Sequence, residues 1–158
     1  MSDRMLFRFI LVGRMKDPAL KAKVEEYLTR LSGRAKCEVA ELKDSRRDVE
    51  CREIMRRLSS CGRELVIVLS EDGEELSSME LAGRLAAVDT RVNFVVGGAD
   101  GLTEEVKSAA GMVWSLSRLT FPHEVARLLL CEQLYRVYNL AHGGSYHHLS
   151  DTQKPKRK

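Results

Sequence analysis

The sequence predicts an α/β protein with a mostly parallel β-sheet and helices on both of its faces. Short apolar runs of strand length alternate along the chain with longer segments of helical periodicity, which is typical of parallel strand–helix units. One run, Leu65–Leu69, is almost wholly apolar, as a strand covered on both faces should be. The 158 residues suffice for one such domain with a real core and are too few for two.

The first half of the chain is predicted to hold three strands and two helices. Asp17 can cap a helix whose first turn holds Pro18, because a carboxylate accepts hydrogen bonds from the free amides of a helix start. The stretch before the second helix is polar and charged, which favours a surface loop. The predicted elements are a strand at Leu6–Val12, a helix at Ala19–Leu31, a strand at Cys37–Leu42, a loop at Asp44–Asp48, a basic helix at Val49–Leu58 and a strand at Leu65–Leu69.

The second half repeats the alternation and ends in the longest predicted helix. Ser77 and Glu80 have the spacing of a capping box, and Thr103 suits the start of a short helix. Glu132 and Arg136 form an i,i+4 pair on the outer side of the last helix. The predicted elements are a helix from Ser77 to Val88, a strand at Val92–Val96, a helix at Thr103–Ala110, a strand at Met112–Ser115 and a helix at Glu124–Ala141.

The positive charge of the chain is small but unevenly distributed. The formal net charge is only +3, yet five arginines crowd one region and the chain ends in the run Lys154–Lys158. A solvated helix face or a frayed terminus produces such clusters as readily as an RNA-binding surface does, so charge alone leaves both interpretations open. The five arginines are Arg46, Arg47, Arg52, Arg56 and Arg57.

Other classes of protein are disfavoured by composition. The sequence has no apolar run that approaches the roughly 18 residues of a membrane helix. Met1–Arg4 precedes a single apolar run of strand length, which is too short for a signal peptide and lacks a small-residue cleavage site, so we expect a cytoplasmic protein. The cysteines have neither CxxC spacing nor a nearby histidine at the spacing of a zinc site, so we expect buried free thiols and no metal. They are Cys37, Cys51, Cys61 and Cys131.

Two loops at predicted strand ends are candidates for a small-molecule pocket. The strand at Val92–Val96 ends in Gly97-Gly98, and bare backbone at such a break can approach a ligand closely. The second loop, Ser117–Pro122, alternates hydroxyl and apolar side chains and stops just before the last helix. In an open α/β sheet such loops converge at one edge. A glycine pair alone is also compatible with a plain strand-to-helix turn.

The order of GGADGL, WSLS, LTFPH and LLLCEQLYR resembles that of the small SPOUT-type RNA methyltransferases. Within them the chain is most similar to the RlmH family, which methylates N3 of a pseudouridine in large-subunit ribosomal RNA. The resemblance covers about residues 5–148 and is densest at 94–138. It implies S-adenosylmethionine (SAM) as cofactor, a homodimer, the assembled ribosome as partner and a C-terminal trefoil knot formed by roughly Leu65–Ala141.

The resemblance also implies which residues act at each end of the site. Arg118 departs from the small residue usual in the family, so its side chain is expected to point outward. His123 matches a position that lines the pocket. The residues implied to hold SAM are Leu69, Gly98, Ser117, Arg118, Leu119, Thr120, Phe121 and Pro122.

The substrate end is implied to involve Arg136, Tyr146 and His147. Arg136 would lie near the target, Tyr146 would stack on or hydrogen-bond the base, and His147 would accept or relay the N3 proton. The family ending Asn-His-Pro is here Gly143–Ser145, and an arginine is replaced by His148. We expect residues 1–148 to form a single domain and the basic residues 149–158 to form a disordered tail.

The last helix has more apolar side chains than one sheet face needs, which favours a homodimer. The residues in question are Leu129, Leu130, Leu134 and Tyr138. Two other functions remain open from the residues themselves. A non-enzymatic nucleotide- or RNA-binding module could use the same sheet, and a flavodoxin-like regulator could bind a phosphorylated ligand at the glycine turn.

Overall fold

The computed structural model of the chain describes residues 5–148. In this part five strands pair in parallel in the order β2-β1-β4-β3-β5. The predicted α/β class with a parallel sheet is therefore confirmed. The elements are β1 (Leu6–Val12), α1 (Pro18–Ser32), β2 (Lys36–Leu42), α2 (Arg47–Leu58), β3 (Leu65–Glu75), α3 (Ser78–Ala86), β4 (Val92–Val96), α4 (Glu104–Ala109), β5 (Met112–Ser115) and α5 (His123–Ala141).

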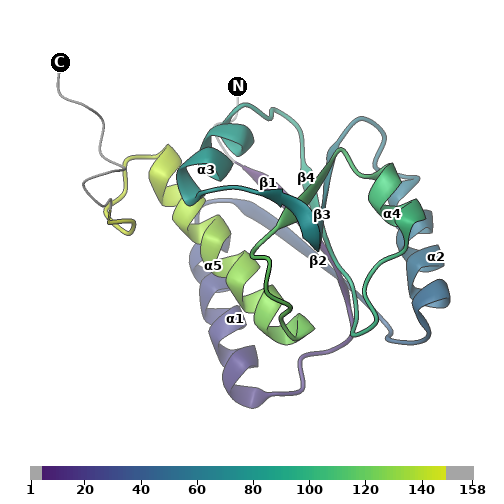
Figure 1. Cartoon of the computed structure of the whole chain (residues 1–158). Coiled ribbons are helices and arrows are strands. Elements are labelled where there is room, and N and C mark those ends of the chain that lie inside the picture. Colours follow the sequence, from purple (N-terminus) through teal and green to yellow (C-terminus); the bar gives the residue numbers. More distant parts are fainter. Residues whose placement is uncertain (1–4, 149–158) are drawn as a thin grey trace.

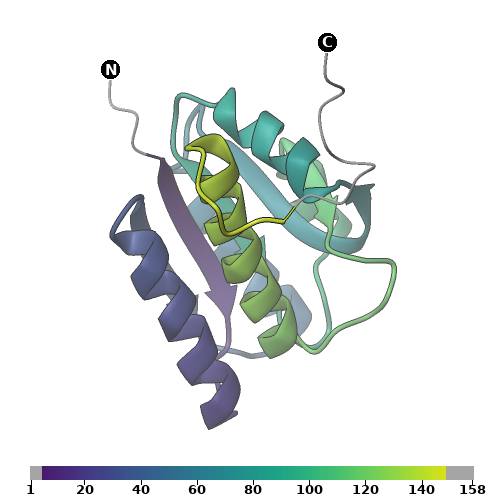
Figure 2. The same ribbon diagram turned by 90° about the vertical axis from the view of Figure 1, so that its left-hand side faces the viewer.

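Helices cover both faces of the sheet, so the molecule has two apolar layers. Figure 1 shows α1, α3 and α5 on one side and α2 and α4 on the other. Alternation along β1 supplies both layers, since Phe7 and Phe9 pack in the first while Ile10 and Val12 pack in the second. On the first face α5 lies between α1 and α3, as Figure 2 shows.

The helix starts follow the predicted capping. Asp17 Oδ1 accepts from the amides of Ala19 at 2.9 Å and Leu20 at 3.2 Å, and Ser77 forms the capping box with Glu80. The predicted loop at Asp44–Asp48 is partly wrong, because α2 begins at Arg47. Charged residues there belong to the first helical turn, where acidic side chains complement the positive end of the helix dipole.

Strand β3 does not end at Leu69 as its apolar pattern indicates. It continues to Glu75 and pairs twice with β5, with an irregularity between Leu69 and Glu74. Gly73 permits this, because a Cβ there would lie 2.6 Å from the carbonyl oxygen of Val113. The residues between Leu69 and Glu74 bulge out of the strand toward the carboxyl edge of the sheet, and we call this segment the β3 excursion.

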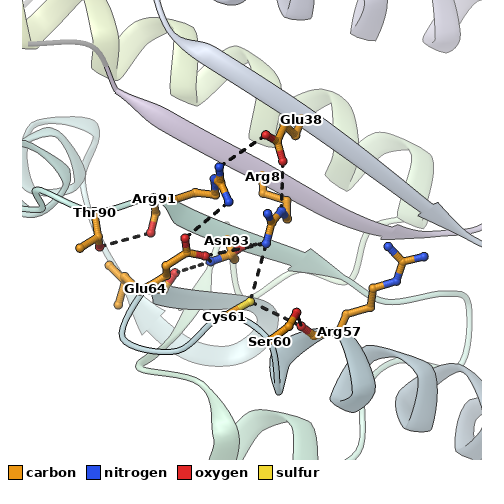
Figure 3. Close-up of polar contacts among 10 residues, drawn as sticks. Arg8, Glu38, Arg57, Ser60, Cys61, Glu64, Thr90, Arg91 and Asn93 are labelled. Carbon is orange, nitrogen blue, oxygen red and sulfur yellow. Dashed lines mark hydrogen bonds and ion pairs between the residues drawn. The ribbon is translucent and has the colours of Figure 1, made fainter. Parts of the chain in front are cut away.

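The amino edge of the sheet is closed on the α2 side by a polar network (Figure 3). Arg8 Nε lies 3.3 Å from Glu38, and Arg91 lies 3.5 Å from both Glu38 and Glu64. The buried amide of Asn93 donates to Glu64 at 3.2 Å and accepts from Arg8 at 3.4 Å. The cations and carboxylates in this network are equal in number.

Several predictions concern features other than the sheet. Within residues 5–148 no helix is both long and apolar enough to cross a membrane, and no three His, Cys, Asp or Glu side chains gather where they could hold a metal. Cys51, Cys61 and Cys131 are buried free thiols, as predicted, and Cys37 is half-buried. Burial raises the pKa of the Cys131 thiol to about 12. The trefoil knot stays a prediction, and the predicted tail at 149–158 lies outside the described residues.

Candidate functional site

A cavity of about 660 Å³ opens at the carboxyl edge of the sheet. It lies where β3, β4 and β5 end and where α5 begins, which is where open α/β sheets bind ligands. Seven of the eight residues predicted to hold SAM line it. They are Leu69, Gly98, Ser117, Leu119, Thr120, Phe121 and Pro122. The exception is Arg118, whose side chain is 87% exposed and lies 3.9 Å from Glu75.

The glycine turn forms one wall of the cavity. The amide of Gly101 donates to the carbonyl of Gly98 at 3.1 Å, and Gly101 adopts a φ of +77° that favours glycine. A Cβ on Gly98 would lie 2.9 Å from Glu50 Oε1 and 3.1 Å from a Val12 methyl group. The backbone at Gly98 therefore lies close to the buried carboxylate of Glu50 in α2. The sequence had suggested only a close approach to a ligand in the cavity.

The loop after β5 is shaped by its own hydroxyl groups. Ser115 donates to the carbonyl of Ser117 at 2.7 Å, and Ser117 Oγ accepts from the amide of Leu119 at 3.1 Å. Thr120 donates to Glu71, which joins this loop to the β3 excursion across the cavity wall. The hydroxyls thus stabilise the loop and leave apolar side chains facing the cavity.

The lining of the cavity is acidic. Glu71 and Asp100 line it, and none of the described lining residues is a lysine or arginine. A ligand with positive charge suits such a site better than an anion. Sequence reasoning missed Glu71 because β3 was expected to end at Leu69. It also missed Ala126, although this residue lies one helical turn beyond His123, which lines the cavity as predicted.

The start of α5 is fastened to the loop between β1 and α1. Glu124 Oε1 accepts from the backbone amides of Lys16 at 2.5 Å and Asp17 at 3.0 Å. These two hydrogen bonds hold the pKa of Glu124 below its usual value. Glu124 thereby fixes where α5 presents His123 and Ala126 to the cavity.

Arg127 is buried, which is unusual for an arginine. Its guanidinium donates to the carbonyls of Gly13 at 2.8 Å and Val12 at 3.2 Å, and lies 3.3 Å from Glu41. Burial lowers the pKa of Arg127. The side chain satisfies the carbonyl groups at the end of β1 and so stabilises the wall beside the cavity.

The residues predicted at the substrate end lie together. Arg136 Nη1 is 2.9 Å from His147 Nδ1, and its guanidinium lies 4.9 Å from the centre of the Tyr146 ring. Glu132 accepts hydrogen bonds from both Arg136 and Tyr146. The Glu132–Arg136 pair is therefore half-buried under the C-terminal segment, not on an outer face as predicted.

The glycines after α5 explain how the chain returns to that helix. Gly143 has a φ of +70°, and the amide of Gly144 donates to the carbonyl of Asn139 at 2.7 Å. A Cβ on Gly144 would overlap the side-chain amide of Asn139. Figure 2 shows the segment folding back across the end of α5. The departure from the family ending thus produces a tight reversal.

Tyr146 is held in its protonated form. Burial, followed by its hydrogen bond to Tyr27 and the negative charge of Glu132, raises the pKa of Tyr146. Its ring packs edge-on against Tyr135 with centres 4.7 Å apart. His147 Nε2 is buried and has no hydrogen-bond partner among the described residues. These contacts dock the C-terminal segment on its own α1 and α5.

The two ends of the site are separated within one chain. Ala126 lines the cavity, and Arg136 lies ten residues further along the same helix. At 1.5 Å per residue the separation is roughly 15 Å along the helix axis. The structure therefore brings the predicted cofactor residues together and the predicted substrate residues together, but it does not bring the two groups to each other.

Some known proteins are similar to this chain in sequence, and others are similar to it in fold. A ribosomal RNA large subunit methyltransferase H from Prochlorococcus marinus (strain MIT 9211) is 42% identical over 142 residues, covering 89% of this chain and 94% of the relative. One from Parasynechococcus marenigrum (strain WH8102) is 42% identical over 141 residues, with 89% and 94% covered.

Among solved structures, a tRNA (m1G37) methyltransferase from Aquifex aeolicus superposes with a TM-score of 0.58 at 17% identity, covering 96% of this chain and 78% of that one. A putative RNA methyltransferase from Bacillus anthracis gives 0.56 at 13% identity, with 84% and 94% covered. These two likenesses concern the fold. The sequence also matches the family described as "Predicted SPOUT methyltransferase" over residues 5–147. On this match and the identity to the curated relatives, the chain belongs to the SPOUT methyltransferase family.

Proposed function

We propose that this protein transfers the methyl group of SAM to N3 of a pseudouridine in the RNA of the large ribosomal subunit. The observation that carries the proposal is the 42% identity to relatives named ribosomal RNA large subunit methyltransferase H over 89% of the chain. The cavity supports it, because the residues that the family resemblance assigns to the cofactor converge there. The assembled ribosome as substrate and a cytoplasmic location are parts of the same proposal.

The cavity suits SAM in size, apolar lining and charge. A volume of about 660 Å³ is within the range of small-molecule sites, which is about 300–1,000 Å³. Leu69, Leu116 and Phe121 offer apolar surface for the adenine ring. SAM supplies a methyl group on a positively charged sulfur, and Glu71 and Asp100 provide compensating negative charge. The acidic lining disfavours the alternative of a regulator that binds a phosphorylated ligand.

The chain's own residues position the reactants and handle one proton. Methyl transfer from a sulfonium has a good leaving group, so positioning supplies most of the acceleration. The N3 proton of the base must leave, and we assign its acceptance to His147, with Tyr146 contacting the base. Because arginine only donates, the contact with Arg136 makes His147 Nδ1 an acceptor and puts the proton of the neutral ring on Nε2.

Arg136 therefore controls whether His147 can act as a base. While Arg136 donates to Nδ1, the ring has no free acceptor nitrogen. An RNA phosphate is a stronger partner for a guanidinium than a neutral imidazole is. When Arg136 turns to the phosphate of the bound RNA, Nδ1 becomes free to take the N3 proton. The arrangement on α5 is then the resting state of the substrate end.

The separation of about 15 Å along α5 supports a homodimer with shared sites. One protomer would provide the cavity and its partner the C-terminal segment. The apolar argument for a dimer is weaker than the sequence suggested, because Leu130 and Leu134 are fully buried in the protomer's own core. The half-exposed Leu129 and Tyr138 remain available to a partner.

The proposal is tested by incubating the protein and labelled SAM with ribosomes from a strain that lacks this methylation. Mass spectrometry of the digested RNA should show one new N3-methylated pseudouridine. Ala126→Phe places a ring in the cavity from a half-exposed position of α5, so SAM binding measured by calorimetry and methyl transfer should both be abolished. Ala86→Phe, at the exposed end of α3, is the matched control and should retain both. Transfer to another nucleotide, or none by the wild type, would refute the proposal.

A further inference from the structure

One segment inside the described part of the chain, residues 43–63, is distinctly basic. This segment carries seven lysines and arginines and four acidic residues. The remaining residues carry 19 of each sign, from totals of 26 and 23, so they are neutral as a group. Residues 43–63, which comprise α2, the loop before it and the turn after it, thus carry a net charge of +3 by themselves.

The arginines of α2 are exposed and only partly neutralised. The side chains of Arg46, Arg52 and Arg56 are 80%, 77% and 71% exposed. Asp48 is shared between Arg46 at 3.6 Å and Arg52 at 3.8 Å. Glu53 is shared in the same way between Arg56 at 2.6 Å and Arg57 at 3.5 Å. Each carboxylate offsets one of its two arginines, so the surface keeps positive charge.

The arginines of the polar network at the amino edge of the sheet, unlike those of α2, are fully paired with carboxylates (Figure 3). Arg8 and Arg91 there are matched one to one by Glu38 and Glu64, and their side chains are 25% and 22% exposed. That charge is neutralised within the protein. Arg57 extends from α2 beside the network, lining a hollow of about 350 Å³ that Arg8 and Ser60 also line.

The basic surface begins at the cofactor cavity. Glu50, in the first turns of α2, packs against Gly98 in the cavity wall and accepts from the amide of Ser45 at 2.8 Å. A Cβ on Gly13 would lie 3.7 Å from both Asp44 Cβ, in the loop before α2, and His123 Nε2, which lines the cavity. From there the twelve residues of α2 extend about 18 Å. An RNA strand whose target base enters the cavity can thus reach the arginines of α2.

We propose that the outer face of α2 is the surface on which the RNA substrate docks, with Arg52 and Arg56 contacting phosphates that flank the target nucleotide. This inference rests on the proposed function. The planar guanidinium of arginine suits phosphate, and such contacts fix the position of a nucleic acid without reading its sequence. Charge complementarity next to the cavity distinguishes this face from an ordinary solvated helix.

The test compares Arg52→Gln/Arg56→Gln with Lys23→Gln/Lys36→Gln, which removes the same charge from exposed positions on α1 and β2. Binding of deproteinised large-subunit ribosomal RNA is measured by filter retention over a series of salt concentrations. The slope of log affinity against log salt should become shallower in the α2 variant by about 0.7–0.9 for each phosphate that the variant no longer binds. The control should keep the wild-type slope, and both variants should keep the wild-type affinity for SAM.

The outcomes separate this inference from the proposed function. An unchanged slope in the α2 variant, or an equal change in the control, overturns the docking surface. Loss of methyl transfer to ribosomes with unchanged RNA affinity also overturns it, because the arginines would then contact a ribosomal protein. A wild type that binds RNA with the expected slope difference but transfers no methyl group would refute the proposed function and leave the docking surface supported.

Discussion

At the scale of single residues, the contact between Gly98 and Glu50 links the cavity wall to α2. Glu50 is 5% exposed, and its carboxylate both accepts from the amide of Ser45 and fills the space beside Gly98. A buried carboxylate needs such partners, because an unpaired one costs several kcal/mol. A glycine is therefore required at position 98 by packing against the protein itself.

Gly98→Ala should destabilise the protein by about 1–3 kcal/mol, because its Cβ would meet Glu50 and Val12 at distances shorter than normal van der Waals contact. In a Glu50→Ala background the same change should cost less, since one clash is gone. Urea unfolding measures both. Gly83→Ala in α3 is the control: nothing lies within 4 Å, so it should stabilise by about 0.5–1 kcal/mol. Equal costs of Gly98→Ala in both backgrounds would show that Glu50 is not the obstacle.

His147→Ala should lower the rate of methyl transfer about 10²–10⁴-fold, the usual effect of losing one positioned acid–base group. SAM affinity should be unchanged, because His147 does not line the cavity. The measurement is single-turnover transfer to ribosomes, followed over a range of pH. His148→Ala, at an exposed neighbouring position, is the control and should stay near wild type. A rate loss of less than tenfold for His147→Ala would contradict its role as the base.

At the scale of elements, the cavity depends on how strand and helix ends are joined. The β3 excursion brings Glu71 to Thr120, and Glu124 at the start of α5 accepts from the amides that precede α1. Arg127, one turn later in α5, binds the carbonyls at the end of β1. These hydrogen bonds connect elements that are distant in sequence, and together they hold the loops around the cavity in a single arrangement.

Glu124→Gln should reduce the acid sensitivity of folding. The pKa of Glu124 is lower in the folded chain than its usual 4.5, so its ionisation stabilises the fold above that value. This stabilisation is lost as pH falls below 4.5 through the folded pKa. Urea midpoints at pH 7 and pH 3.5 should therefore differ less in the variant than in the wild type. An identical difference would exclude a contribution from Glu124.

At the scale of the whole molecule, the two halves of the site lie at different positions along α5. Within a single protomer the residues proposed to hold SAM line the cavity, whereas His147, the base proposed for the substrate end, is docked against Arg136 further along α5. A dimer of the 17.9 kDa chain resolves this separation if each segment reaches the partner's cavity.

Mixing two inactive variants tests this arrangement. Ala126→Phe blocks the cavity, and removal of residues 143–158 takes away the substrate end. A heterodimer keeps one intact cavity facing one intact segment, so part of the activity should return. Light scattering and mass spectrometry verify that the heterodimer has formed. If the verified heterodimer stays inactive, or the wild type is a monomer at micromolar concentration, the sharing of sites is excluded.

The order of the elements and the loops that form most of the cavity wall follow from the sequence alone. Strand and helix periods reflect which side chains must be buried, and this is a local property of the chain. The parallel sheet and the family assignment were predicted and are confirmed. Loops that follow parallel strands meet at one edge, which is why seven of the eight residues proposed for SAM could be placed together beforehand.

The polar contacts between elements that are distant in sequence could not be predicted without the tertiary structure. The burial of Arg127, the contact of Glu50 with Gly98 and the reach of Glu71 to Thr120 join residues between 48 and 115 positions apart. No local pattern encodes such pairs, because their energy depends on burial and on the partner's position. The distance between the cavity and the C-terminal segment could not be predicted from the sequence for the same reason. Residues that belong to one family motif can still lie far apart along a helix.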